Sequence, residues 1–89
     1  MENVNLKEAT IVDVREPFEF EMGNVNGSIN IPLGEVPGKV EEFKNMKKPL
    51  VLCCASGGRS GQATQFLASN GIDDVHNGGG WNMVQMQLL

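Results

Sequence analysis

The feature that most constrains this chain is a short apolar run that ends in a cysteine and passes directly into a loop of small residues. Residues 50–53 are continuously apolar, which is typical of a strand buried on both faces of a sheet, and Cys54 stands at the end of this run. Beyond the loop, apolar residues recur at helical spacing: Ala63, Phe66 and Leu67. The helical pattern stops at Gly71. The stretch therefore predicts a strand, a tight loop and a helix.

The composition of the loop predicts an anion-binding site. Three of its residues add almost no side-chain bulk: Ser56, Gly57 and Gly58. Backbone N–H groups can then converge on one point. Arg59 or Ser60 stands at the helix start, where unpaired N–H groups and the helix dipole favour negative charge. Because such a field lowers the pKa of a thiol, we expect Cys54 to be a reactive thiolate that needs no histidine as a base.

The alternative for Cys54 is a buried and inert cysteine at a strand end. The small residues that follow it favour the reactive interpretation, since they contribute little to packing. Cys53 lies one residue earlier, so its side chain points to the opposite face, and we expect it to be a small core residue. The only histidine, His76, lies far along the chain and is predicted to be a surface residue of a strand. Trp81 is predicted to belong to the core.

Length, charge and cysteine content limit the possible classes of protein. With 89 residues we expect one domain, residues 1–89, and the net charge of −4 argues against nucleic-acid binding and against binding to an anionic membrane. No apolar run approaches the ~20 residues of a membrane span. The two cysteines are adjacent and form no disulfide framework, and they are too few for a zinc site. We therefore expect no metal and no cofactor, a reducing cytoplasmic location without a signal peptide, and a monomer.

The rest of the chain alternates between strand and helix patterns. Strands are predicted at 10–15, 28–33, 50–53 and 73–76, and helices at 17–22, 37–46, from the loop to 71, and 81–88, with a turn at 77–80. Residues 1–8 could be a frayed arm or a short helical turn. This order predicts an α/β fold with a mainly parallel central sheet of four to five strands and helices on both faces. In such sheets the site lies beyond the carboxyl ends of the strands, where Cys54 stands.

Four segments of the chain resemble one family. The run Cys-Ala-Ser-Gly-Gly-Arg-Ser from Cys54, with four residues between Cys54 and Arg59, resembles the active-site loop of rhodanese-type sulfurtransferases. The other three segments, 11–20, 23–33 and 77–81, resemble the family's Asp-x-Arg strand, its "GHIPGAINIPL" segment and its closing Gly-Gly-x-Trp region, in the right order. The chain is thus identified as resembling the single-domain rhodanese-like sulfurtransferases over nearly its whole length.

The resemblance implies an enzyme of the thiosulfate sulfurtransferase type. Sulfane sulfur would pass from thiosulfate or a protein persulfide, through a persulfide on the cysteine, to cyanide, a thiol or a partner protein. The implied site residues are Cys54 as the catalytic residue, the loop residues Ala55, Ser56, Gly57, Gly58, Arg59 and Ser60, and the supporting residues Asp13 and Arg15. Arg59 would add charge to the loop or anchor it by a salt bridge. For Asp13 and Arg15, a buried ion pair or cap is favoured over side chains that face the site.

The chain also departs from the family pattern. Ala55 stands where many members carry arginine, which removes a cation from the loop rim and disfavours thiosulfate, a dianion. The short N-terminus leaves open whether the family's first edge strand is present. Two alternatives remain: a non-enzymatic binding module, and a phosphatase or arsenate reductase. The latter enzymes have five residues between cysteine and arginine, whereas this chain has four.

Overall fold

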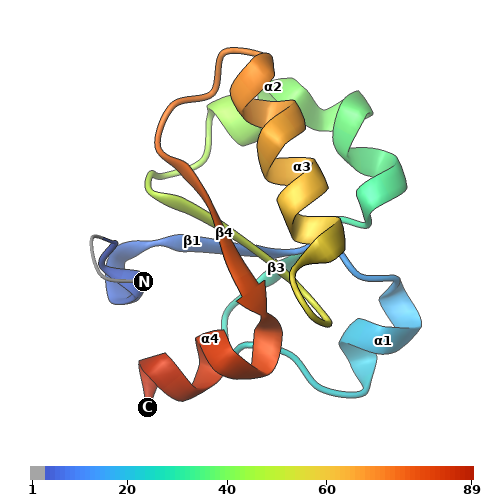
Figure 1. The fold of residues 1–89 in the computed structure, drawn as a ribbon, viewed down its shortest axis with the longest axis vertical. Helices are drawn as coiled ribbons and strands as arrows, with labels where there is room; N and C mark the ends of the chain where they lie inside the picture. The colour runs from blue at the N-terminus through green and yellow to red at the C-terminus, as the bar shows by residue number, and fades with distance from the viewer. Residues whose placement is uncertain (1–3) are drawn as a thin grey trace.

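The computed structural model describes residues 4–89 and contains a parallel four-stranded sheet. Its strands are β1 (Thr10–Asp13), β2 (Ile29–Asn30), β3 (Leu50–Cys54) and β4 (Val75–Gly80), in the spatial order β2-β1-β3-β4 (Figure 1). Every neighbouring pair is parallel. The predicted α/β class with a parallel sheet of four to five strands is therefore confirmed, with four strands within residues 4–89.

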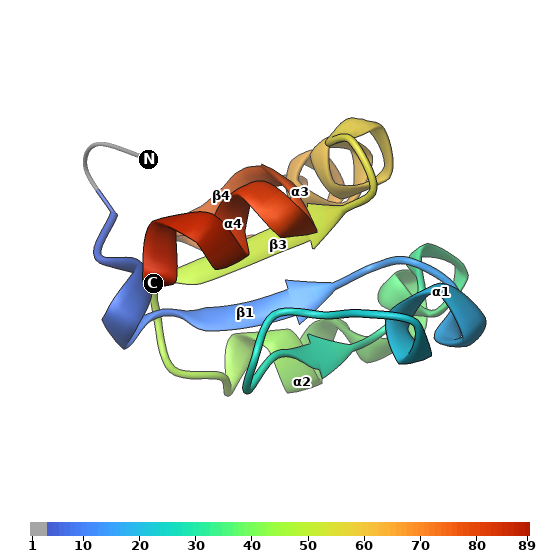
Figure 2. The same ribbon diagram turned by 90° about the horizontal axis from the view of Figure 1, so that it is seen from below.

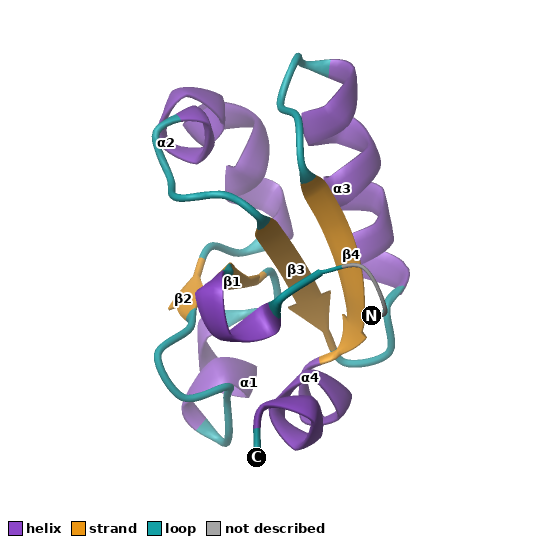
Figure 3. Ribbon diagram, turned by 90° about the vertical axis from the view of Figure 1, so that its left-hand side faces the viewer, coloured by secondary structure: helices purple, strands orange, loops and turns teal. Residues whose placement is uncertain are grey.

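Helices cover both faces of this sheet. The α-helices are α1 (Pro17–Glu21), α2 (Val40–Lys44), α3 (Gly58–Ser69) and α4 (Trp81–Leu88), and two 3-10 helices, η1 (Leu6–Glu8) and η2 (Leu33–Lys39), accompany them. β1 and β3 run between α2 and α4 (Figure 2), and the strands form the middle of the molecule with helices around them (Figure 3). Parallel strands need crossovers of this kind, and the helices bury the two sheet faces.

The central strand β3 divides the core into two layers. All five of its residues are buried. Leu50, Leu52 and Cys54 join the cluster formed with η2, α2 and α3, whereas Val51 and Cys53 join the cluster formed with η1 and α4. This alternation confirms that Cys53 and Cys54 point to opposite faces of the sheet. It also places Cys54 under α3.

The region 77–80 differs from the expectation. It was predicted as a turn but belongs to β4, because β3 and β4 change register between Leu52 and Cys53. Asn77 pairs with Leu52 and Gly79 pairs with Cys53, so Gly78 is an extra residue between them. Gly79 has a φ of +83°, which glycine adopts without strain. The glycines that suggested a turn are thus the residues of an irregular strand.

Other element boundaries also differ from the sequence prediction. The expected helix at 37–46 is a 3-10 helix through Lys39 that contains Pro37, followed by the short α2. The backbone at Lys39 is not helical, with a φ of −124° and a ψ of 22°, so α2 begins only at Val40. The expected strands at 10–15, 28–33 and 73–76 are shorter or start later, and β3 is one residue longer. Within residues 4–89 the N-terminal part forms η1 and no edge strand. None of the helices in the described residues is long and apolar enough to cross a membrane.

A substitution at Gly78 can test the close approach of β4 to β3. A Cβ at Gly78 would lie 2.7 Å from Val51 Cγ1 and 3.0 Å from Val84 Cγ2, both in the core. We expect Gly78→Ala to lower the free energy of unfolding by about 1–3 kcal/mol through overpacking, as measured by urea denaturation. Gly34→Ala is the control, because a Cβ there meets no atom within 4 Å. Equal stability of the two variants would contradict this view of β4.

Candidate active site

Cys54 is the last residue of β3 and lies at the carboxyl edge of the sheet. Its side chain is only 1% exposed. The loop from Ala55 to Gly57 connects it to α3. Gly57 has a φ of +104°, and a Cβ there would lie 3.3 Å from Gly79 Cα, so both its backbone conformation and its surroundings require glycine. The loop therefore turns within three residues and directs the start of α3 at the cysteine.

Hydrogen-bond donors of the loop and of α3 converge on the sulfur of Cys54. The backbone N–H of Gly57 lies 3.0 Å from Sγ, the N–H of Ser60 lies 3.4 Å away, and the Ser60 hydroxyl oxygen lies 3.3 Å away. The donors belong to the loop and the first turn of α3, where helix N–H groups lack intrahelical partners. N–H groups thus converge on one point, as the small loop residues led us to expect, and anion binding by the loop stays a prediction.

The pKa of Cys54 follows from two opposing effects. Burial by itself would raise it, but hydrogen bonds from the Ser60 hydroxyl and from the N–H groups of Ser60, Ser56 and Gly57 outweigh burial and lower the pKa to about 7. The lowered pKa favours the thiolate form of Cys54, which is the nucleophilic one. The neighbouring Cys53 is the opposite case: burial, and then the charge of Asp13, raise its pKa to about 12.

Arg59 anchors the loop to α1. Its two terminal nitrogens lie 2.7 and 3.0 Å from the two carboxylate oxygens of Glu19, a bidentate ion pair. The Arg59 hydrogen bond, followed by one from the Glu16 backbone, lowers the pKa of Glu19 to about 2. Of the two expected roles for Arg59, the structure shows the salt bridge. Sequence reasoning did not identify Glu19, whose spacing from Glu16 and Pro17 signals only a helix N-terminus.

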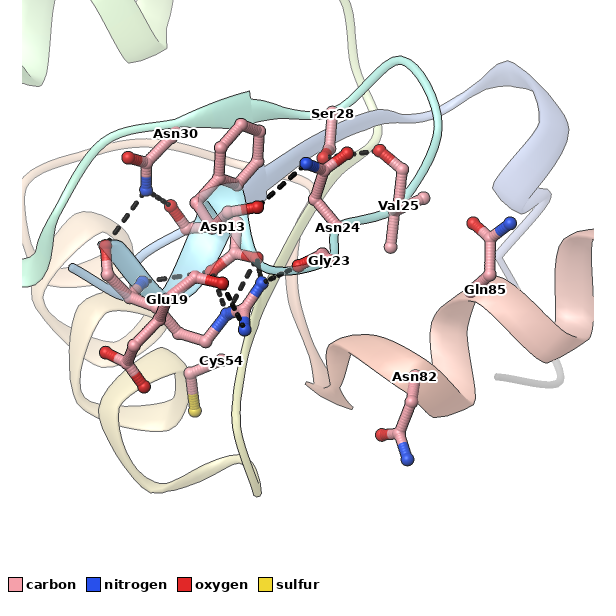
Figure 4. A network of polar contacts seen from close by, with 12 residues as sticks. Asp13, Glu19, Gly23, Asn24, Val25, Ser28, Asn30, Cys54, Asn82 and Gln85 are labelled. Carbon is pink, nitrogen blue, oxygen red and sulfur yellow. Dashed lines mark hydrogen bonds and ion pairs between the residues drawn. The ribbon is translucent and has the colours of Figure 1, made fainter. Parts of the chain in front are cut away.

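Asp13 and Arg15 form the buried ion pair that was favoured for them. Arg15 Nη2 lies 2.7 Å from Asp13 Oδ2, and neither side chain is more than 5% exposed. Arg15 also donates to the backbone oxygens of Glu19 and Gly23, which lie beside Asp13 in the polar network of Figure 4. It lies 4.9 Å from the ring centroid of Trp81. Arg15 holds the backbone of Glu19, and the Glu19 side chain forms the ion pair with Arg59. The Asp13–Arg15 pair therefore supports the cysteine loop indirectly. Trp81 itself is half-buried and packs on the core.

Asn77 is a further polar residue of the site. Its Nδ2 donates to the Gly57 carbonyl at 3.0 Å, and its Oδ1 accepts from the Ser60 hydroxyl at 2.6 Å. The sequence placed Asn77 in a turn, and no local signal indicates these contacts, since the register shift in β4 creates them. His76 lies in the same strand, half-buried, and contacts Asp74 at 2.7 Å. Within residues 4–89, no three histidine, cysteine or acidic side chains group to hold a metal ion.

These observations define a class: parallel α/β domains in which a cysteine at the carboxyl edge of the sheet accepts hydrogen bonds from the following loop and helix start. The chain belongs to the rhodanese family, since the model of the rhodanese-like domain matches residues 1–87. The resemblance inferred from the four sequence segments is thereby confirmed.

Curated relatives and solved structures agree with this assignment. The chain is 41% identical to the uncharacterized protein YqhL of Bacillus subtilis over 80% of its own length and 56% of that protein. It is 37% identical to thiosulfate sulfurtransferase PspE of Escherichia coli over 84% of its length and 73% of PspE. A rhodanese-related protein of Thermoplasma volcanium superposes with a TM-score of 0.77 at 38% identity, over 94% of this chain and 82% of that one. The chain thus spans little more than half the length of YqhL.

The Ser60 hydroxyl provides a test of the thiolate site. We expect Ser60→Ala to raise the pKa of Cys54 by about one unit, because the thiolate loses a charge-assisted hydrogen bond. The measurement is the pH dependence of the rate of alkylation by iodoacetamide. Ser69→Ala, an exposed serine on the same helix, is the control. An unchanged pH profile would mean that the backbone N–H groups alone hold the thiolate.

Proposed function

We propose that this chain is a sulfurtransferase in which Cys54 carries sulfane sulfur as a persulfide. The observation that carries the proposal is the set of hydrogen bonds that the loop and the start of α3 donate to Cys54 Sγ, which lower the pKa of this thiol to about 7. Membership in the rhodanese family and the likeness to a thiosulfate sulfurtransferase support it. Cys53, with its raised pKa, takes no part.

The proposed reaction has two displacement steps. The Cys54 thiolate attacks the outer sulfur of the donor and forms a new S–S bond. The bond between that sulfur and the rest of the donor breaks, and the leaving group departs with the electron pair, as sulfite from thiosulfate or as a thiolate from a persulfide. A nucleophilic acceptor then attacks the terminal sulfur, and the Cys54 thiolate leaves. No net oxidation or metal is required, and each step is covalent catalysis by a thiolate.

The loop stabilises negative charge on sulfur in both states. In the persulfide the charge lies mainly on the terminal sulfur, one bond further from β3. N–H groups of residues 55–60 and the N-terminus of α3, which follow Cys54 directly, would stabilise the charge there. Because these groups are held by the backbone, they need no rearrangement when the charge moves.

The charge around the loop favours a persulfide donor over thiosulfate. Arg59 is bound to Glu19, Arg15 is bound to Asp13, and Ala55 on the loop adds no charge. Neither arginine is free to compensate a dianion such as thiosulfate, whereas a persulfide carries a single charge. We therefore propose a protein persulfide or a low-molecular-weight persulfide as the preferred donor, and a thiol or a partner protein as the acceptor.

The phosphatase alternative has less support. Its chemistry needs an arginine that binds the tetrahedral anion, but the guanidinium of Arg59 is engaged by both carboxylate oxygens of Glu19. A binding module without activity is the remaining alternative. The cytoplasmic location, the monomeric state and the single domain of residues 1–89 remain predictions.

Intact mass measurement tests the sulfur-carrier function directly. The reduced protein is incubated with thiosulfate or with glutathione persulfide, and we expect a gain of one sulfur atom that dithiothreitol reverses. The gain should be absent in Cys54→Ser and present in Cys53→Ala, the matched control. No gain with either donor would overturn the sulfurtransferase proposal and favour the binding module.

The donor preference has its own test at Ala55. We expect Ala55→Arg to raise kcat/KM for thiosulfate about fivefold, since an exposed ion pair contributes up to ~1 kcal/mol. Ala55→Gln, which has similar length and no charge, is the control and should leave the value near that of the parent protein. The gain should shrink as the salt concentration rises. An equal gain in both variants would contradict the charge argument.

A further inference from the structure

The Ser60 hydroxyl has two potential acceptors and one hydrogen. Its oxygen lies 2.6 Å from Asn77 Oδ1 and 3.3 Å from Cys54 Sγ, and Ser60 is fully buried. A hydroxyl donates a single hydrogen bond, so it cannot serve both partners at once. Asn77 Oδ1 and Cys54 Sγ are therefore alternative acceptors for one hydrogen.

The amide of Asn77 is held in one orientation. Nδ2 donates to the Gly57 carbonyl at 3.0 Å, and Oδ1 accepts from the N–H of Gly79 at 3.0 Å. Exchanging the two amide atoms would break both contacts, so Oδ1 is the atom that faces Ser60. The absence of a side chain at Gly61 leaves the space for this amide, because a Cβ there would lie 3.1 Å from Nδ2.

We propose that Asn77 is a positioning residue that competes with Cys54 for the Ser60 hydroxyl. The hydroxyl donates to Sγ in the empty thiolate and returns to Asn77 Oδ1 when Cys54 carries a persulfide. This inference rests on the sulfur-carrier function proposed above. No covalent bond changes in this step, which is a rotation of the hydroxyl about its C–O bond.

The physical basis is the position of the negative charge. In the thiolate the charge is on Sγ, and a hydrogen bond to a charged acceptor is the stronger one. In the persulfide the charge has moved to the terminal sulfur, and Sγ becomes a weak, neutral acceptor. The amide oxygen of Asn77 then receives the hydrogen. Asn77 thus disfavours the empty thiolate and favours both the neutral thiol and the loaded state.

Other charges near Cys54 stay the same in the variants below. They are Arg59 of α3 with its partner Glu19 of α1, and Asp13 and Arg15 around β1. The thiol of Cys53 on β3 is neutral, since burial raises its pKa. His76, on β4 beside Asn77, contacts Asp74. A change that requires the Ser60 hydroxyl can therefore be separated from a general electrostatic effect.

A double-mutant cycle on the empty protein tests the competition. The pH dependence of alkylation is compared for the parent, Asn77→Ala, Ser60→Ala and the double variant. Any loosening of the loop by Asn77→Ala acts on the backbone N–H groups in both backgrounds. We measure the change in the Cys54 pKa that Asn77→Ala causes in each background. We expect this change to be about half a unit more negative with Ser60 present than in Ser60→Ala.

A second substitution separates competition from loss of structure. Asn77→Asp keeps an oxygen acceptor at the same position and strengthens it. We expect it to raise the Cys54 pKa more in the Ser60 background than in the Ser60→Ala background, a coupling opposite in sign to that of Asn77→Ala. Equal shifts in both backgrounds, or couplings of the same sign, would overturn the inference.

The loaded state supplies the last measurement. At a pH well above the Cys54 pKa, the protein is equilibrated with a mixture of glutathione and glutathione persulfide, and the loaded fraction is measured by mass. We expect Asn77→Ala to lower the loading constant about threefold relative to the parent protein. The double variant should have the same loading constant as Ser60→Ala alone. Equal effects of Asn77→Ala in both backgrounds would overturn the inference. Failure to load at all would refute the sulfur-carrier function, whereas the pH profiles would still decide the competition for the hydroxyl.

Discussion

A thiolate at the end of a buried strand needs compensation, because burial by itself raises the pKa of a thiol. In this protein the compensation comes from the N–H groups of Gly57 and Ser60 and from the Ser60 hydroxyl, all within 3.4 Å of Cys54 Sγ. The other features of the site place these donors. The left-handed backbone at Gly57 shortens the loop, and the start of α3 directs its first N–H groups at the sulfur. The lowered pKa of Cys54 is thus a property of the β3–α3 connection.

Two arginines near this connection hold structure together and add no free charge to the site. Arg59 joins the loop to α1 through Glu19, and Arg15 joins β1 to the segment around Gly23 through Asp13 and backbone oxygens. Both ion pairs are tightly hydrogen-bonded. The positive field at the sulfur therefore comes from backbone N–H dipoles and the Ser60 hydroxyl, which supports the proposal of a singly charged persulfide over a dianion as the donor. The same geometry explains how Asn77 can influence the site through one hydroxyl.

Much of the architecture was predictable because it depends on local patterns. The apolar run of β3, the glycine-rich loop and the helical spacing of α3 lie consecutively in the sequence, and the opposite orientations of Cys53 and Cys54 follow from strand geometry. The proposed site residues of the loop were found in the same way. The 3-10 helix at Leu33–Lys39 was missed, since the i, i+4, i+7 spacing of apolar residues does not distinguish an interrupted helix from a continuous one.

The sequence by itself determined the strand–loop–helix unit around Cys54, because adjacent residues build it through backbone preferences and hydrophobic periodicity. Only the tertiary structure decided which side chains reach that unit from elsewhere. Glu19 lies 40 residues before Arg59 in the chain, and Asn77 lies 17 residues after Ser60, yet each makes a hydrogen bond there of 2.7 Å or less. The contact of Asn77 depends on a one-residue shift between β3 and β4. Such a shift depends on the packing of Gly78 against Val51 and Val84, which no local pattern encodes.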